Sequence, residues 1–119
     1  MSPSPQPNLV VIRSSEIERA VKFYNILGLA MTRHAHGSGP EHYAAEVNGF
    51  VFEIYPATAK SLPTTGTRIG FKVNSVDELI AKLSQMGSVI ISPLADSEWG
   101  RRAVVKDFDG HTVELIESK

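Results

Sequence analysis

Two stretches of the chain carry the same order of apolar and polar residues, 59 positions apart. Residues 9–28, LVVIRSSEIERAVKFYNILG, align with residues 68–87, RIGFKVNSVDELIAKLSQMG. Each begins with alternating side chains, which predicts a strand with two different faces. Each continues with apolar residues three or four positions apart, which predicts an amphipathic helix. The shared order indicates an internal repeat.

The two predicted helices also share start and stop signals. Ser15 with Glu18, and Ser75 with Glu78, have the spacing of a capping box. A glycine follows the last apolar position of each helix, as expected at a C-terminal cap. These signals support the same helix in both halves.

The ends of the two units match as well, now at an offset of 61. NGFVFEIY, residues 48–55, aligns with DGHTVELI, residues 109–116. The Asn-Gly and Asp-Gly pairs predict tight turns between antiparallel strands. Each following strand carries one glutamate at the same position, Glu53 or Glu114. Two more strands are expected in each unit, at 29–36 and 41–47, and at 88–92 and 101–106.

The sequence therefore predicts an α+β fold of two tandem βαβββ modules. We expect curved mixed sheets, with the helices on the outer face and a cleft on the inner face. The face opposite the helices mixes charged and apolar residues, so it is either solvated or lines that cleft. The predicted bounds are a disordered N-terminal tail at 1–7, a single domain at 8–119, module one at 8–56, a linker at 57–66 and module two at 67–118.

Composition narrows the classes of partner. The 119 residues include 12 Lys and Arg against 13 Asp and Glu, a net charge of −1. We expect no nucleic-acid partner, because no excess of positive charge is present to follow a phosphate backbone. The absence of cysteine excludes disulfides and thiolate metal sites. No run is long enough to span a membrane, and the Pro/Ser-rich start lacks the apolar core of a signal peptide, so a cytoplasmic protein is expected.

The segments ERAVKFYNILGL and WGRRAVVKDFDGHTVELIE resemble the vicinal oxygen chelate superfamily. Its members include glyoxalases, bleomycin-resistance proteins, fosfomycin-resistance enzymes and extradiol dioxygenases. The resemblance covers nearly the whole chain after the tail and implies two βαβββ modules. It does not assign one activity, because this fold carries several chemistries. It also points to a homodimer, which would cover the open sheet edges of a single chain.

The resemblance implies where a metal would bind in metal-dependent members. They commonly have a histidine on the first strand and a glutamate on the last strand of each module. The glutamate positions fall on Glu53 and Glu114, and the histidine positions on Leu9 and Arg68. Leucine cannot bind a metal, and arginine is a permanent cation that repels one. We therefore expect no metal and no other cofactor.

Arg68 offers a different role at this place. Its guanidinium could pair with one or both of Glu53 and Glu114. Such a trio is either an internal salt bridge without a ligand or a polar floor that recognises an anion or a carbonyl group. Tyr55 shares the face of Glu53, and Trp99 lies in a loop where a flat ring suits an apolar ligand. The predicted ligand-binding residues are Glu53, Tyr55, Arg68, Trp99 and Glu114.

Histidines give a second set of candidates. His34 and His36 share one face of a predicted strand, and His42 follows on the next strand. An H-x-H pair with a third histidine could bind a metal, although such histidines are more often surface residues. His111 follows the Asp-Gly turn and is expected to face the helix or solvent.

The leading hypothesis is a metal-independent small-molecule-binding protein of the glyoxalase/bleomycin-resistance type. It would hold an organic ligand in a cleft floored by Glu53, Arg68 and Glu114. The alternative is a metal-dependent lyase, isomerase or dioxygenase that uses Glu53 or Glu114 with a histidine from another strand. A third hypothesis is an interaction module whose cleft is vestigial. No catalytic residue is assigned.

Overall fold

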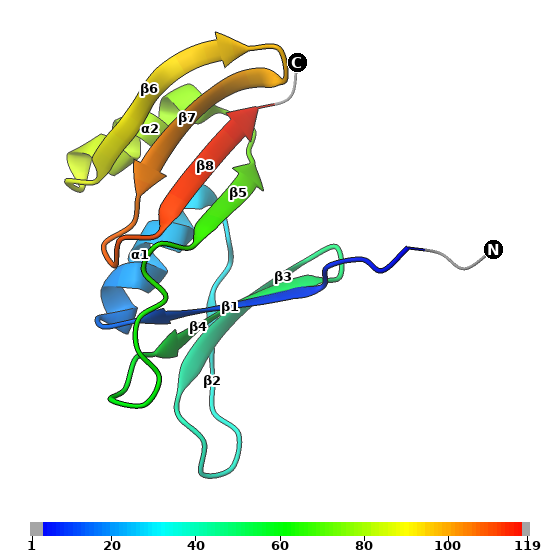
Figure 1. Ribbon diagram of the computed structural model, residues 1–119, viewed down its shortest axis with the longest axis vertical. Helices are drawn as coiled ribbons and strands as arrows, with labels where there is room; N and C mark the ends of the chain where they lie inside the picture. Colours follow the sequence, from blue (N-terminus) through cyan, green and yellow to red (C-terminus); the bar gives the residue numbers. More distant parts are fainter. Residues whose placement is uncertain (1–3, 118–119) are drawn as a thin grey trace.

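The computed structural model describes residues 4–117, and Figure 1 shows the repeated order of strand, helix and three strands. The elements are β1 (Leu9–Ser14), α1 (Ile17–Leu27), β2 (Thr32–His34), β3 (His42–Val47), β4 (Phe50–Pro56), β5 (Arg68–Lys72), α2 (Val76–Gln85), β6 (Val89–Ser97), β7 (Gly100–Lys106) and β8 (Thr112–Glu117). The predicted α+β fold of two tandem βαβββ modules is confirmed.

Each module forms its own four-stranded mixed sheet. The strand order is β1-β4-β3-β2 in the first sheet and β5-β8-β7-β6 in the second. The first and last strands of each module pair in parallel, and the remaining pairs are antiparallel. Val11 pairs with Glu53 in the first sheet, as Gly70 pairs with Glu114 in the second. These matching registers confirm the offsets of 59 and 61 residues between the modules.

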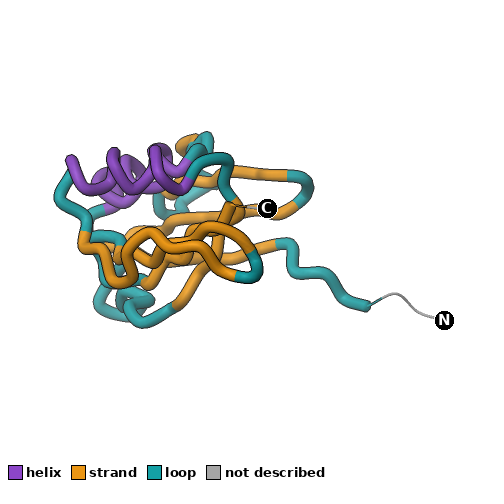
Figure 2. The backbone as a smooth tube through the Cα atoms, turned by 90° about the horizontal axis from the view of Figure 1, so that it is seen from above, coloured by secondary structure: helices purple, strands orange, loops and turns teal. Residues whose placement is uncertain are grey.

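One hydrophobic core joins both sheets and both helices. The first sheet contributes Ile12 and Ile54, and the second contributes Val113 and Leu115, all fully buried. Figure 2 shows the two helices gathered on one side of the strands. The helices therefore cover the face of each sheet that carries these buried residues. Because each sheet presents one face to this core, its other face points away from the core.

The two sheets do not close on each other. No strand pair links them within residues 4–117, so β1 and β5 are both edge strands. The radius of gyration is 15.1 Å, whereas a compact chain of this length is expected at about 13.5 Å. In Figure 1 the strands of the first sheet run in a different direction from the strands of the second sheet. The chain is thus more open than a typical domain of its size.

The predicted start of the first helix is wrong by one residue. Glu16 is the N-cap of α1, and no side chain caps it. The Ser15 backbone N–H instead donates to the Asp109 carboxylate of the second module, at 2.9 Å. A contact from 94 residues away therefore replaces the expected local pairing of Ser15 with Glu18. In α2 the cap by Ser75 is confirmed, because Ser75 Oγ accepts a hydrogen bond from the backbone of Glu78.

Two strands differ in length from the prediction. β2 covers only Thr32–His34 of the expected 29–36, whereas β6 extends from Val89 to Ser97 beyond the expected 88–92. β6 passes through two register shifts against β7, and such irregularities let a strand continue past Pro93.

The ends of the chain lie partly outside the described residues. Residues 1–3 of the predicted disordered tail at 1–7 lie outside the described residues. Residue 118, the predicted end of module two, also lies outside them. Residues 4–7 are exposed and have no regular secondary structure. Within the described part of the chain, neither helix is long and apolar enough to cross a membrane.

Candidate functional site

Each sheet has an open face, by which we mean the face opposite the hydrophobic core. The first open face carries Glu53 and Tyr55, and the second carries Arg68 and Glu114. Trp99 lies in the turn between β6 and β7, where it is 70% exposed. The structure brings Arg68 together with Glu114, but it places Glu53 on the other sheet. Within one chain the five predicted site residues therefore form separate groups.

Glu114 lies at the centre of the second open face between two arginines. Arg68 Nη2 donates to Glu114 Oε2 at 2.5 Å, and Arg102 Nη2 donates to the same oxygen at 3.1 Å. The Arg68 hydrogen bond, reinforced by Arg102, holds the pKa of the Glu114 carboxyl below its usual value. The predicted pairing of Arg68 with a carboxylate is confirmed. Arg68 nevertheless keeps 57% of its side chain exposed, so this pair is not a buried one.

Arg102 was not among the predicted site residues. It lies on β7, where its neighbour Val104 is the direct partner of Glu114. Side chains two positions apart on a strand share a face, so the alternation of β7 contained the signal. The strand registers put Lys72 and Lys106 on the second open face as well. The face is therefore positively charged around one carboxylate, which suits an anionic or carbonyl group of a ligand.

Glu53 has a different neighbour on the first open face. His42 Nε2 lies 3.7 Å from Glu53 Oε2, and the His42 ring stacks on Tyr55 with centroids 4.3 Å apart and planes within 4°. His42 is only 3% exposed. The sequence named His42 as a candidate ligand, and it offered Glu53 or Glu114 with a histidine from another strand, but it did not pair His42 with Glu53. The connection depends on the β3–β4 register, in which Ala44 pairs with Glu53.

His34 and His36 lie beside this group. The His42 ring centroid is 5.8 Å from that of His34 and 5.4 Å from that of His36. His34 pairs directly with His42 between β2 and β3. The three histidines therefore form one cluster on the first open face, next to Glu53. We call these four residues the imidazole cluster.

His111 belongs to a buried network instead. Its Nδ1 lies 2.7 Å from Asp107 Oδ2, which also accepts a 2.6 Å hydrogen bond from the Tyr24 hydroxyl. Thr64 Oγ1 lies 2.5 Å from His111 Nε2. Burial by itself raises the pKa of Asp107, but the hydrogen bonds from His111 and Tyr24 together outweigh this effect, and the net shift is downward. Burial, and then the charge of Asp107, raise the pKa of Tyr24.

This network ties the modules together rather than presenting a free site. Among residues 4–117, Asp107, Asp109 and His111 are the one group whose possible metal-binding atoms all lie within 4.8 Å of one another. The oxygens of Asp107 already accept hydrogen bonds from Tyr24 and from the backbone of Asp109 and His111. His111 is fully buried, as expected if it faces the helix side.

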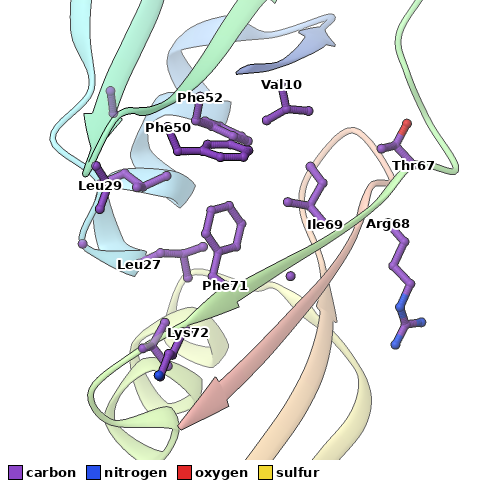
Figure 3. A pocket seen from close by; sticks show the side chains of 15 residues that line it. Val10, Leu27, Leu29, Phe50, Phe52, Thr67, Arg68, Ile69, Phe71 and Lys72 are labelled. Carbon is purple, nitrogen blue, oxygen red and sulfur yellow. The ribbon is translucent and has the colours of Figure 1, made fainter. Parts of the chain in front are cut away.

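An apolar cavity of about 630 Å³ lies between the core side of the first sheet and β5. Phe50, Phe52 and Phe71 point into it in Figure 3, whereas the Arg68 side chain points away. Its volume is in the range of small-molecule pockets. The sequence did not predict this cavity, because its walls come from both modules.

The residues that the resemblance places at the family metal positions do not fit a metal ion. Leu9 offers no donor atom, and the Arg68 guanidinium is hydrogen-bonded to Glu114, one of the two carboxylates concerned. Glu53 and Glu114 lie on separate sheets, and each sheet turns its open face away from the shared core. No reaction step through a metal at these positions follows from this geometry.

Comparisons with known proteins agree with this fold. The antibiotic-binding protein TnmS3 from Streptomyces sp. CB03234 is 20% identical, with a TM-score of 0.74 over 100% of both chains. Oxidase ChaP-H2 is 19% identical, with a TM-score of 0.74 over 98% of this chain and 95% of that one. Hypothetical protein SA1046 from S. aureus is 18% identical, with a TM-score of 0.73 over 95% and 96%.

No curated protein sequence matches the chain. The family model of the Glyoxalase/Bleomycin resistance protein/Dioxygenase superfamily matches residues 6–115. The match covers both modules and includes each predicted site residue. The chain belongs to the glyoxalase/bleomycin resistance protein/dioxygenase superfamily.

Proposed function

We propose that the protein binds a small organic molecule on its open faces, without a metal at the family positions. The observation that carries this proposal is the cluster of Arg68, Arg102 and Glu114. A guanidinium has five N–H donors, and each arginine here uses one of them in its hydrogen bond to Glu114. The remaining donors suit a ligand carboxylate, phosphate or carbonyl oxygen.

The similar structures support a binding role without choosing a reaction. TnmS3 is described as an antibiotic-binding protein and ChaP-H2 as an oxidase. The fold therefore serves both binding and catalysis, and fold alone does not decide between them. Binding is the role that we favour, because the resemblance places Arg68 and Leu9, neither of them a metal ligand, at the family histidine positions.

We also propose that the protein is a homodimer whose site is shared. A single cleft floored by Glu53, Arg68 and Glu114 needs the first open face to meet a second open face. The two open faces of one chain point away from the common core. A partner chain could supply the missing face, and the edge strands β1 and β5 offer unpaired backbone groups for that contact. Tyr55 and Trp99 remain proposed contacts of the ligand in that cleft.

The alternative is a metal-dependent lyase, isomerase or dioxygenase that uses Glu53 with a histidine from another strand. One observation favours it, the position of His42 Nε2 at 3.7 Å from Glu53 Oε2. That geometry concerns metal binding and leaves the reaction open.

A thermal-shift screen with small aromatic acids and ketones tests the proposed function. A ligand present at 100 times its dissociation constant adds about 2.7 kcal/mol of stability. The best compound is then titrated by calorimetry into the parent, Glu114→Gln, Arg102→Gln and Glu53→Gln. Glu78→Gln is the matched control, because Glu78 is exposed on α2.

We expect the three site substitutions to weaken binding at least tenfold and the control to leave it unchanged. Equal affinity in all variants would contradict a site on the open faces. If Phe71→Ser alone weakens binding, the ligand occupies the apolar cavity instead. The absence of any stabilising compound across the screen would argue against small-molecule binding.

A further inference from the structure

His42 and Glu53 are already spaced as two ligands of one metal ion. Zinc bound tetrahedrally at about 2.1 Å separates its donor atoms by about 3.4 Å. His42 Nε2 and Glu53 Oε2 are 3.7 Å apart, so a shift of a few tenths of an ångström brings them to that spacing. They come from neighbouring strands of one sheet, and this backbone fixes their separation.

The second ring nitrogen of His42 has the partner that metal-binding histidines usually have. His42 Nδ1 lies 3.3 Å from the carbonyl oxygen of Pro40. A carbonyl accepts hydrogen bonds only, so this contact puts a proton on Nδ1, and in the neutral ring the lone pair is then on Nε2. Stacking on Tyr55 and nearly complete burial hold the ring in place. The lone pair is thus directed toward the side of Glu53.

His34 and His36 are the candidates for the further ligands, and His34 Nε2 lies 2.9 Å from the Thr32 hydroxyl oxygen, a contact that metal binding would have to replace. Their ring centroids lie 6.0 Å apart and within 5.8 Å of the His42 ring. His36 is exposed and precedes Gly37, which has a φ of 57° in the β2–β3 turn. The three imidazoles therefore lie close together without converging on a single point, and rotation of the accessible His34 and His36 side chains has to complete the ligand set.

We propose that the imidazole cluster of His34, His36, His42 and Glu53 is a binding site for one divalent transition-metal ion. Imidazole nitrogens with one carboxylate favour Zn²⁺, Ni²⁺ or Co²⁺ over Mg²⁺ or Ca²⁺. This site lies on the β2–β3–β4 part of the first sheet; it shares Glu53 with the family pattern but replaces both family histidine positions with histidines from other places in the chain. It goes beyond the proposed function, which needs no metal ion.

The test is a titration of untagged, chelator-treated protein with Zn²⁺ alone by calorimetry, and with Co²⁺ by visible absorption. We expect saturable binding of one ion per chain near neutral pH, with Co²⁺ absorption bands typical of nitrogen and oxygen ligands. His36→Ala, His34→Ala and Glu53→Gln should each weaken binding about tenfold or more. Glu46→Gln is the matched control, because Glu46 is an exposed carboxylate elsewhere on β3, and it should leave affinity unchanged.

His42→Ala is left out because loss of a buried ring endangers folding. Acidification gives a second readout, since protons compete with the metal ion for imidazole nitrogens and the affinity should fall as the pH is lowered. Absence of saturable Zn²⁺ binding at neutral pH would overturn the proposal. Binding that survives all three substitutions would also overturn it, because the ion would then lie elsewhere. Binding of an organic ligand after chelator treatment is measured separately, so the two proposals fail independently.

Discussion

The Tyr24 hydroxyl of the first module donates a 2.6 Å hydrogen bond to Asp107 of the second, across 83 residues of sequence. Both groups are buried, and His111 and Thr64 continue the network into the linker. This network joins α1 to the turn between β7 and β8. The contact therefore holds the two modules in their relative orientation.

Loss of the Tyr24 hydroxyl should destabilise the fold. Tyr24→Phe leaves the ring packing intact but removes one donor to the buried Asp107 carboxylate, which costs about 1–3 kcal/mol. Urea denaturation followed by fluorescence measures this change. Tyr43→Phe is the control, because the Tyr43 hydroxyl donates to Glu18 at the surface, and its effect should be much smaller. Equal losses in the two variants would contradict a special role for the Tyr24–Asp107 pair.

Stability should fall as the solution becomes acidic, and Asp107 should contribute to that fall. The pKa of Asp107 is lower in the folded protein than its ordinary value of 3.8. A carboxyl with a lowered folded pKa stabilises the protein above its unfolded pKa and loses this contribution as pH falls through the folded pKa. We expect the loss to begin below about pH 4. The Tyr24 hydrogen bond contributes to lowering this pKa, so Tyr24→Phe should be less stable than the parent at neutral pH. This difference in stability should narrow as the solution becomes acidic. Urea titrations of both proteins at a series of pH values measure it.

Arg68→Ala should have a small effect on stability. The Arg68 side chain is 57% exposed and Arg102 still pairs with Glu114 after the substitution. Exposed ion pairs contribute up to about 1 kcal/mol, and the loss should not exceed that value. The double substitution Arg68→Ala, Arg102→Ala should cost more than the sum of the single ones, since it leaves Glu114 without a cation. Chemical denaturation of the three variants measures the coupling, and strict additivity would contradict a shared role.

Gly110 should not tolerate a side chain. It has a φ of 91°, and an added Cβ would lie 2.9 Å from Thr65 Cγ2 in the linker. The backbone conformation and this contact together should cost Gly110→Ala at least about 1 kcal/mol. Gly70→Ala is the control, because Gly70 has no atom within 4 Å of the added Cβ and no positive φ. Thermal denaturation that ranks the two variants equally would contradict the close approach of the linker.

Sedimentation should give the mass of two chains at micromolar concentration. Leu9 is 54% exposed on the edge strand β1, where the proposed dimer places the positive second open face of the partner. Leu9→Lys should therefore shift the protein toward a single chain. Leu62→Lys is the control, because Leu62 is 68% exposed in the linker. The mass of one chain for the parent would contradict the shared cleft.

Much of each module follows from local sequence. Apolar residues alternate along β1 and β4, and a strand turns successive side chains to opposite faces, so the burial of Ile12 and Ile54 could be predicted. The repeat placed Glu53 and Glu114 at equivalent positions, and the registers agree. The pairing of Arg68 with Glu114 followed from the same alternation, because neighbouring parallel strands bring their side chains together on one face.

Contacts between distant segments were decided only by the tertiary structure. Alternation fixes the direction of a side chain relative to its own strand, but it carries no information on how two sheets pack around a shared core. That packing separates Glu53 from Arg68 within one chain, and it buries Asp107 against Tyr24. The place of His42 beside Glu53 depended on the register of β3, because a shift of one residue would have turned the imidazole to the core.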